Sequence, residues 1–143
     1  MQPSKRILPP VLLLLLLAGC ARDPAWLVER TLAAREKALA LKDLKGYVAL
    51  FHPGYRYQEG QTDTVLSWAQ KKFAAHDSIG LTTSNTRITF EENGEIARVV
   101  QDFELKAEKN GKVFRTSGTE QFLLKRKKSL LKTEYLFYQG LGI

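Results

Sequence analysis

The 143-residue sequence is short of the residues that most cofactor and metal chemistry requires. It has one cysteine and two histidines, so it can form no internal disulfide and lacks the His/Cys spacing of a zinc site. It also lacks a glycine-rich phosphate loop and a strand-to-helix serine elbow. The sequence therefore predicts no cofactor and no metal.

Only one long hydrophobic run is present, and it is too short to span a membrane. The run from 11 to 17 follows Lys5, Arg6 and two prolines, and it ends at Ala18-Gly19-Cys20. A membrane-spanning helix needs about 20 apolar residues. A basic start, an apolar centre and small residues at the end are typical of a secretory signal peptide.

The stretch Leu17-Ala18-Gly19-Cys20 resembles the lipobox of bacterial lipoproteins. The resemblance implies a signal peptide at 1–19, acylation (palmitate) of Cys20 and a short tether at 20–25. Because Ala21 is not the aspartate typical of inner-membrane retention, it implies export to the periplasmic face of the outer membrane. The alternative is an ordinary cleaved signal followed by a stray cysteine.

The charge of the remaining chain is moderately positive. Subtracting Lys5 and Arg6 from 22 basic residues leaves 20 against 15 acidic ones, a formal charge of +5. The excess is spread along the chain, and we predict no nucleic-acid partner. The run Lys125-Arg126-Lys127-Lys128 is interpreted as a solvated hairpin end, with contact to anionic lipid as the alternative.

Three helices are predicted in the first half. Asp23-Pro24 is a strong helix start, and apolar residues then recur at intervals of three and four up to about residue 42. Asp43 caps a second helix whose inward face includes Phe51 and which ends at Pro53-Gly54. A short strand at 55–57 and a helix from 63 or 64 to 76 follow.

The second half alternates with the period of strands. Asn93-Gly94 and Asn110-Gly111 separate strands at 81–90, 96–106 and 113–125, and a turn at 126–129 precedes a strand at 130–138. Helices followed by strands indicate an α+β fold. We expect three N-terminal helices packed on one face of a bent, four- to five-stranded antiparallel sheet.

This order resembles the nuclear-transport-factor-2-like (SnoaL-like, cystatin-like) fold over residues 26–143. The segment Asp43 to Tyr55 carries the resemblance best. More loosely, Trp26 and Lys132-Thr133-Glu134 are similar to versions associated with L,D-transpeptidases, although Leu130-Leu131 stands where a tryptophan is common in the family. The resemblance implies a conical cavity, predicted near Tyr47, Trp68 and Gln101.

Family members of the ketosteroid-isomerase type use carboxylates that face this cavity. Alternation places Gln101 inward and Asp102 outward, and a glutamine cannot act as a general base. Glu120 shares a face with Phe122 and Leu124, so it is the candidate for a buried carboxylate. The alternative is a glutamate at the rim or surface, because unpaired glutamate is rarely buried.

Aromatic residues offer either a ligand-binding mouth or plain core. The candidates are Tyr47, Tyr55, Tyr57, Trp68 and Tyr135. His52 and His76 are expected near helix ends as caps or surface groups.

The preferred hypothesis is a membrane-anchored, non-catalytic lipoprotein that is not an enzyme and binds a small ligand or an envelope protein, with a role in cell-envelope maintenance. One alternative is an isomerase or hydrolase using Glu120. Another is a homodimeric scaffold that pairs through the polar outer sheet face, where Arg98, Asp102, Glu104 and Lys106 lie.

Overall fold

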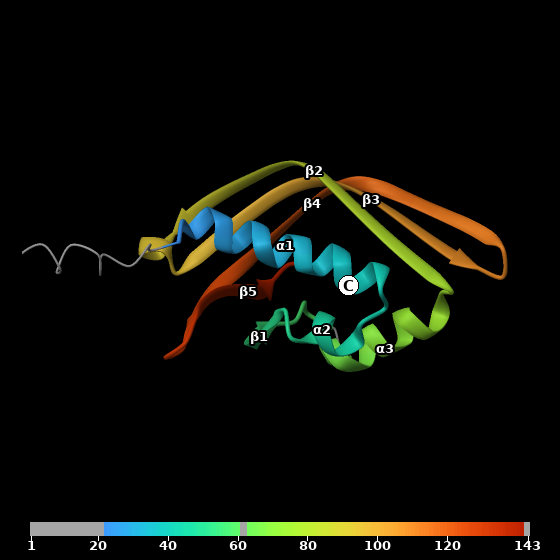
Figure 1. Ribbon diagram of the computed structural model, residues 1–143, viewed down its shortest axis with the longest axis horizontal. Coiled ribbons are helices and arrows are strands. Elements are labelled where there is room, and N and C mark those ends of the chain that lie inside the picture. The colour runs from blue at the N-terminus through green and yellow to red at the C-terminus, as the bar shows by residue number, and fades with distance from the viewer. Residues whose placement is uncertain (1–21, 61–62, 142–143) are drawn as a thin grey trace, which may run out of the picture.

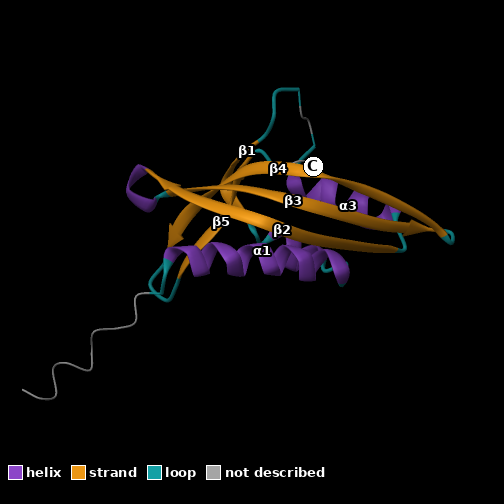
Figure 2. Cartoon of the chain, turned by 90° about the horizontal axis from the view of Figure 1, so that it is seen from above, coloured by secondary structure: helices purple, strands orange, loops and turns teal. Residues whose placement is uncertain are grey.

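The computed structural model describes residues 22–60 and 63–141, and these form one α+β unit (Figures 1 and 2). The elements in chain order are α1 (Pro24–Ala40), α2 (Leu44–Val48), β1 (Phe51–Arg56), α3 (Val65–Ala75), β2 (Ser78–Glu91), the 3₁₀ turn η3 (Glu92–Gly94), β3 (Ile96–Lys109), β4 (Lys112–Lys128) and β5 (Thr133–Gln139). The fold class is as predicted. The expected signal peptide and the lipidation site Cys20 lie outside the described residues.

The three helix starts are fixed by the side chains that the sequence offers as caps. Asp23 accepts a hydrogen bond from the Ala25 amide at 3.0 Å, and Asp43 accepts one from the Gly46 amide at 2.9 Å. Thr64, rather than Asp63, caps α3. These bonds satisfy amides that have no partner inside the helix. No helix among the described residues is long and apolar enough to cross a bilayer.

The sheet is mixed, with strand order β1-β5-β4-β3-β2. All neighbours are antiparallel except β1 and β5, which run parallel with Phe51 opposite Phe137. This differs from the expected all-antiparallel sheet. The second helix ends before Phe51, so Phe51 belongs to the edge strand β1 instead, and Pro53 is tolerated there because an edge strand need not donate every amide.

The turns follow the predicted chemistry at one site and differ at two others. Asn110 and Gly111 both have positive φ, 49° and 73°, as a type I′ hairpin requires. At Asn93-Gly94 the residue Glu92 also has positive φ, which gives a longer turn. The last turn lies at 129–132 instead of 126–129, because β4 continues to Lys128.

The sheet arches over α1, and the core fills the space between them (Figure 1). Its most deeply buried side chains include Val28, Val99, Phe122, Leu124 and Phe137. The outward-facing Asp102 accepts hydrogen bonds from Asn85 and Thr119 instead of entering the core. The inner face therefore carries apolar groups together with the few polar groups described next.

Candidate functional site

A largely buried ion pair joins α1 to β4 at the inner face of the sheet. The Arg35 Nη1 atom lies 2.7 Å from Glu120 Oε1, and Nη2 lies 3.2 Å from Oε2. The side chains are only 8% and 13% exposed. Glu120 thus faces inward beside Phe122 rather than taking the alternative surface position, because Arg35 supplies the partner that a buried carboxylate needs.

The Glu120 carboxylate is held by a second side chain from the neighbouring strand. Gln101, 1% exposed, donates from Nε2 to Glu120 Oε1 at 2.8 Å. The Gln101 carbonyl accepts from Thr86 Oγ1 at 3.1 Å. Oε1 therefore takes two bonds, whereas Oε2 takes one long bond from Arg35 and keeps capacity for a further proton.

A β-bulge brings Thr86 into this network. The pairing of β2 with β3 shifts register between Ser84 and Arg87, and Asn85 has a φ of 51°. The bulge turns Asn85 outward toward Asp102 at 2.8 Å and lets the Thr86 hydroxyl reach Gln101. Bulges commonly re-aim side chains next to functional sites.

Two further titratable groups interact electrostatically with the pair. Burial raises the pKa of Tyr47 to about 12, against the opposing charge and hydrogen bond of Arg35. Burial, followed by the charge of Arg35, lowers the pKa of Lys72, while Glu120 opposes this shift. The Lys72 amine lies 4.8 Å from the centre of the Trp68 ring. Tyr47 is therefore a protonated donor at neutral pH, and Lys72 is a more acidic ammonium than a free lysine.

Arg35 is the functional candidate that the sequence analysis missed. It lies on the inward stripe of α1 with Val28, Leu32 and Leu39. Its Nε is buried without a hydrogen-bond partner in the described structure, and its guanidinium lies 5.8 Å from the Phe122 ring centre. A charged residue in an otherwise apolar stripe is the signal that could have identified it.

The other predicted aromatic residues have mainly structural contacts. Tyr55 donates to the Leu141 carbonyl at 3.3 Å, and Tyr135 donates to the Gly94 carbonyl at 2.6 Å. The exposed Tyr57 accepts from the Val65 amide at 3.2 Å. Tyr47 interacts electrostatically with Arg35 and Glu120, and its ring centre lies 6.0 Å from that of Trp68.

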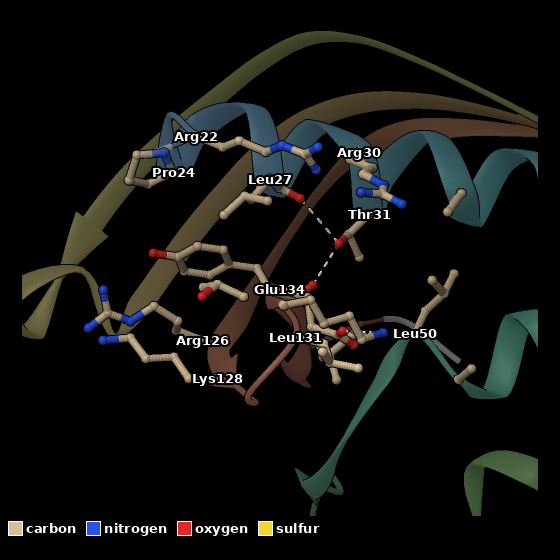
Figure 3. Close-up of a pocket in the computed structure, with 16 residues that line it drawn as sticks. Arg22, Pro24, Leu27, Arg30, Thr31, Leu50, Arg126, Lys128, Leu131 and Glu134 are labelled. Atoms are coloured by element: carbon tan, nitrogen blue, oxygen red, sulfur yellow. Dashed lines mark hydrogen bonds and ion pairs between the residues drawn. The ribbon is translucent and has the colours of Figure 1, made fainter. Parts of the chain in front are cut away.

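A groove of about 770 Å³ lies along the first half of α1, away from the predicted cavity position (Figure 3). Its apolar lining includes Leu27, Leu50 and Leu136, and Tyr135 is the one predicted ligand-binding residue that it contains. Five basic residues also line it: Arg22, Arg30, Arg126, Lys128 and Lys132. The groove is lined by the start of α1, by Ala49 and Leu50 before β1, and by the β4–β5 hairpin.

The histidines do not contribute to either region. His76 Nδ1 lies 3.0 Å from the Lys72 carbonyl at the end of α3, and His52 accepts from the Gly54 amide at 2.9 Å on β1. Over the described ranges 22–60 and 63–141, no three His, Cys, Asp or Glu side chains are grouped to hold a metal ion.

Solved structures with the same architecture identify the fold. A candidate dehydratase of the NTF2-like family from Streptomyces avermitilis aligns over 81% of this chain and 92% of its own, with a TM-score of 0.64 and 12% identity. The domain therefore has an NTF2-like fold. A candidate scytalone dehydratase from Novosphingobium aromaticivorans aligns over 80% and 79% (TM-score 0.66, 14% identity), and the protein Aln2 from a Streptomyces species over 94% and 91% (TM-score 0.64, 13% identity).

Comparison of the sequence alone identifies no relative of this NTF2-like domain. No family model matches the chain, and no curated protein matches it. The expectation that the chain is not an enzyme is nevertheless contradicted, because structural neighbours are named as candidate dehydratases and the interior holds a largely buried carboxylate. No pattern in the sequence marks Arg35 as a partner for Glu120, and a non-catalytic role was therefore expected.

Proposed function

We propose that the chain is an enzyme of the dehydratase or isomerase type that transfers protons at the Arg35–Glu120 pair. The observation that carries the proposal is a carboxylate fixed inside an apolar core, with a lysine of lowered pKa in its electrostatic neighbourhood. Perturbed titratable groups gathered in a protein interior are typical of catalytic sites. The names of two structural neighbours support the same class of reaction.

Glu120, Lys72 and Tyr47 suit the roles of base, acid and hydrogen-bond donor in a dehydration. Glu120 is the base, and its Oε2 atom, with one long hydrogen bond, accepts the proton from a carbon next to a carbonyl group. The C–H electron pair forms the carbon–carbon double bond as the C–O bond to the leaving hydroxyl breaks. Lys72 donates a proton to that hydroxyl, which leaves as water.

Tyr47 stabilises the charge that develops on the substrate, and Arg35 positions the base. The Tyr47 hydroxyl stays protonated at neutral pH because its pKa is about 12, so it can donate a hydrogen bond to the carbonyl oxygen. Arg35 holds Glu120 in place through two hydrogen bonds and is a positioning residue. Proton return from Glu120 to Lys72 completes the cycle without a cofactor.

The first test detects proton abstraction directly. The protein is incubated in deuterated water with a panel of β-hydroxy ketones and cyclic enones, and NMR follows deuterium entry at the carbon next to the carbonyl. Wild-type protein should catalyse exchange, and Glu120→Gln should lower the rate by about 10²- to 10⁴-fold, the usual contribution of a general base. The matched control Glu104→Gln, on the exposed outer face, should keep the wild-type rate.

Two results would contradict this proposal. One is exchange at the wild-type rate in a folded Glu120→Gln protein, with near-ultraviolet circular dichroism as the check of folding. The other is the absence of exchange above the protein-free rate for every compound in the panel.

The sequence also supports a proposal about location. A signal peptide at 1–19 and an acylated Cys20 would place the enzyme on the periplasmic face of the outer membrane. Intact-mass measurement of membrane-extracted protein should give a chain starting at Cys20 with added acyl groups. A Cys20→Ala variant that stays in the membrane fraction, and whose mass differs from wild type only by the substitution itself, would argue against it.

A further inference from the structure

The β4–β5 hairpin ends in two leucines whose side chains are exposed to solvent. Leu130 is 105% exposed and Leu131 is 97% exposed. Central positions of tight turns favour Gly, Asn, Asp and Ser, so the conformation of the turn does not explain the two leucines. Their apolar surface faces solvent in the isolated domain.

The turn holds these leucines in a defined position. The Ser129 amide donates to the Lys132 carbonyl at 2.9 Å, and the Lys132 amide donates to Ser129 Oγ at 3.2 Å. Two bonds across the four-residue turn close the tip of a hairpin that continues the β4–β5 ladder down to Lys128 and Thr133. Leu130 and Leu131 therefore project from the tip of an ordered hairpin.

Positive charge surrounds the tip. Lys127 and Lys128 precede the turn, are exposed, and have no ion pair with a carboxylate in the part of the chain that the structure describes. Lys132 follows the turn and pairs with Glu134. A short apolar tip with lysines on both sides suits the boundary between lipid headgroups and acyl chains, where leucines enter the apolar layer and lysines meet phosphate groups.

The tip lies at the end of the molecule where the described chain begins. Arg22 and Pro24 line the same groove as Lys128, Leu131 and Lys132. Figures 1 and 2 both place the start of α1 and this hairpin at the same end of the molecule, with the β3–β4 turn at the opposite end. Figure 3 shows Arg22, which lies just before α1, and Arg30, which lies on α1, across the groove from the hairpin.

We propose that the β4–β5 hairpin docks the domain on an anionic lipid bilayer, with Leu130 and Leu131 in the headgroup boundary. The groove behind the hairpin then opens at the membrane surface, where Arg22, Arg30 and Lys128 bind lipid phosphates. Arg126 and Lys132 already pair with Glu95 and Glu134. This docking is independent of the enzymatic proposal and does not require acylation. It would hold the domain against the bilayer in one orientation.

An environment-sensitive fluorophore at the tip tests the proposal. The full chain carries Cys20→Ala, so that an introduced Leu130→Cys is its only thiol for labelling. On vesicles containing phosphatidylglycerol, the label should shift to shorter wavelength and be quenched by shallow lipid-borne quenchers. A label at Val113→Cys, an exposed apolar position at the opposite end of the sheet, should keep its emission in water.

Charge variants test the electrostatic part. Lys127→Gln with Lys128→Gln should weaken docking roughly fivefold for each lysine removed, the usual effect of a lysine near an anionic surface. The control pair Lys106→Gln with Lys112→Gln removes the same charge from β3 and β4 near the opposite turn and should leave docking unchanged. Added salt should weaken wild-type docking.

Several results would overturn the proposal. A Leu130→Cys label that keeps its aqueous emission while the chain sediments with vesicles would show that the tip stays out of the bilayer. An equal shift of the Val113→Cys label would show non-specific adsorption. An equal shift on pure phosphatidylcholine would refute the role of anionic lipid.

Discussion

Arg35 on α1 binds both carboxylate oxygens of Glu120, a residue 85 positions later in the chain, inside the core. Taking two charges out of water is costly, and their attraction offsets that cost only while both partners remain. The pair therefore couples the helix layer to the sheet, and each partner alone would be an uncompensated buried charge.

The first prediction concerns the stability contributed by this pair. Arg35→Met leaves the Glu120 carboxylate buried with Gln101, so it should lower the free energy of unfolding by about 3 to 5 kcal/mol. Urea unfolding measures the change. The control Arg115→Met breaks the exposed Arg115–Glu104 pair, where the side chains are 61% and 56% exposed, and should cost less than about 1 kcal/mol. Equal effects of the two substitutions would refute the argument from burial.

A second prediction compares two glycines with positive φ. Gly140 has a φ of 82°, and a Cβ there would lie 3.2 Å from the Gln121 carbonyl oxygen. Gly111, with a φ of 73°, has no atom within 4 Å of a Cβ. Gly111→Ala should cost about 1 to 2 kcal/mol from backbone strain alone. Gly140→Ala should cost more, because the β4 backbone must also move, and a thermal melt of both variants should rank them in this order.

Local patterns in the sequence predicted much of the fold. Asp23, Asp43 and Thr64 act through nearby amides, and Asn110-Gly111 acts through its own φ values, so each could be read without tertiary information. The parallel pairing of β1 with β5 joins Phe51 to Phe137 and could not be read locally.

The candidate site was predictable only in part. Strand alternation placed Gln101 inward, but three consecutive apolar residues, Phe122, Leu123 and Leu124, left the direction of Glu120 open. Its burial depends on Arg35, which comes from another element of the fold. The bulge that turns Thr86 toward Gln101 has no clear sequence signal, and the basic groove exists only where α1 and the β4–β5 hairpin meet.

A third prediction concerns alkaline pH and Tyr47. The pKa is 10.0 for a free tyrosine and about 12 in the fold, so the unfolded chain releases this proton first. The contribution of this pKa difference to the free energy of unfolding is fully present below pH 10.0 and is lost as the pH rises to about 12. A shift of about two pKa units corresponds to about 3 kcal/mol. Tyr47→Phe should lack this loss, and its ultraviolet titration should lack the tyrosinate that forms near pH 12; a titration identical to wild type would contradict the assignment.

The last prediction separates stability from activity at Lys72. Burial lowers the pKa of this ammonium below the ordinary 10.5, so at neutral pH the fold holds a charged group that the unfolded chain solvates better. Between the lowered pKa and 10.5 the unfolded chain binds more protons than the folded one, so wild-type stability rises with pH across that interval. Lys72→Met keeps an apolar stem against Trp68 and removes the charge, so it should be more stable than wild type at neutral pH, with the difference shrinking as the pH approaches 10.5. The same variant should lose deuterium exchange activity, since the proposed acid is gone.

Its neighbour Lys71 provides the control for this prediction. Lys71 is exposed and pairs with Asp63 at 2.9 Å, so Lys71→Met should change stability at neutral pH by less than about 1 kcal/mol and should leave the exchange rate unchanged. Urea unfolding of wild type and both variants at several pH values makes the comparison. A Lys72→Met protein that is less stable than wild type at neutral pH would contradict the burial argument, whereas one that is more stable and fully active would remove Lys72 from the proposed mechanism and leave Glu120 in place.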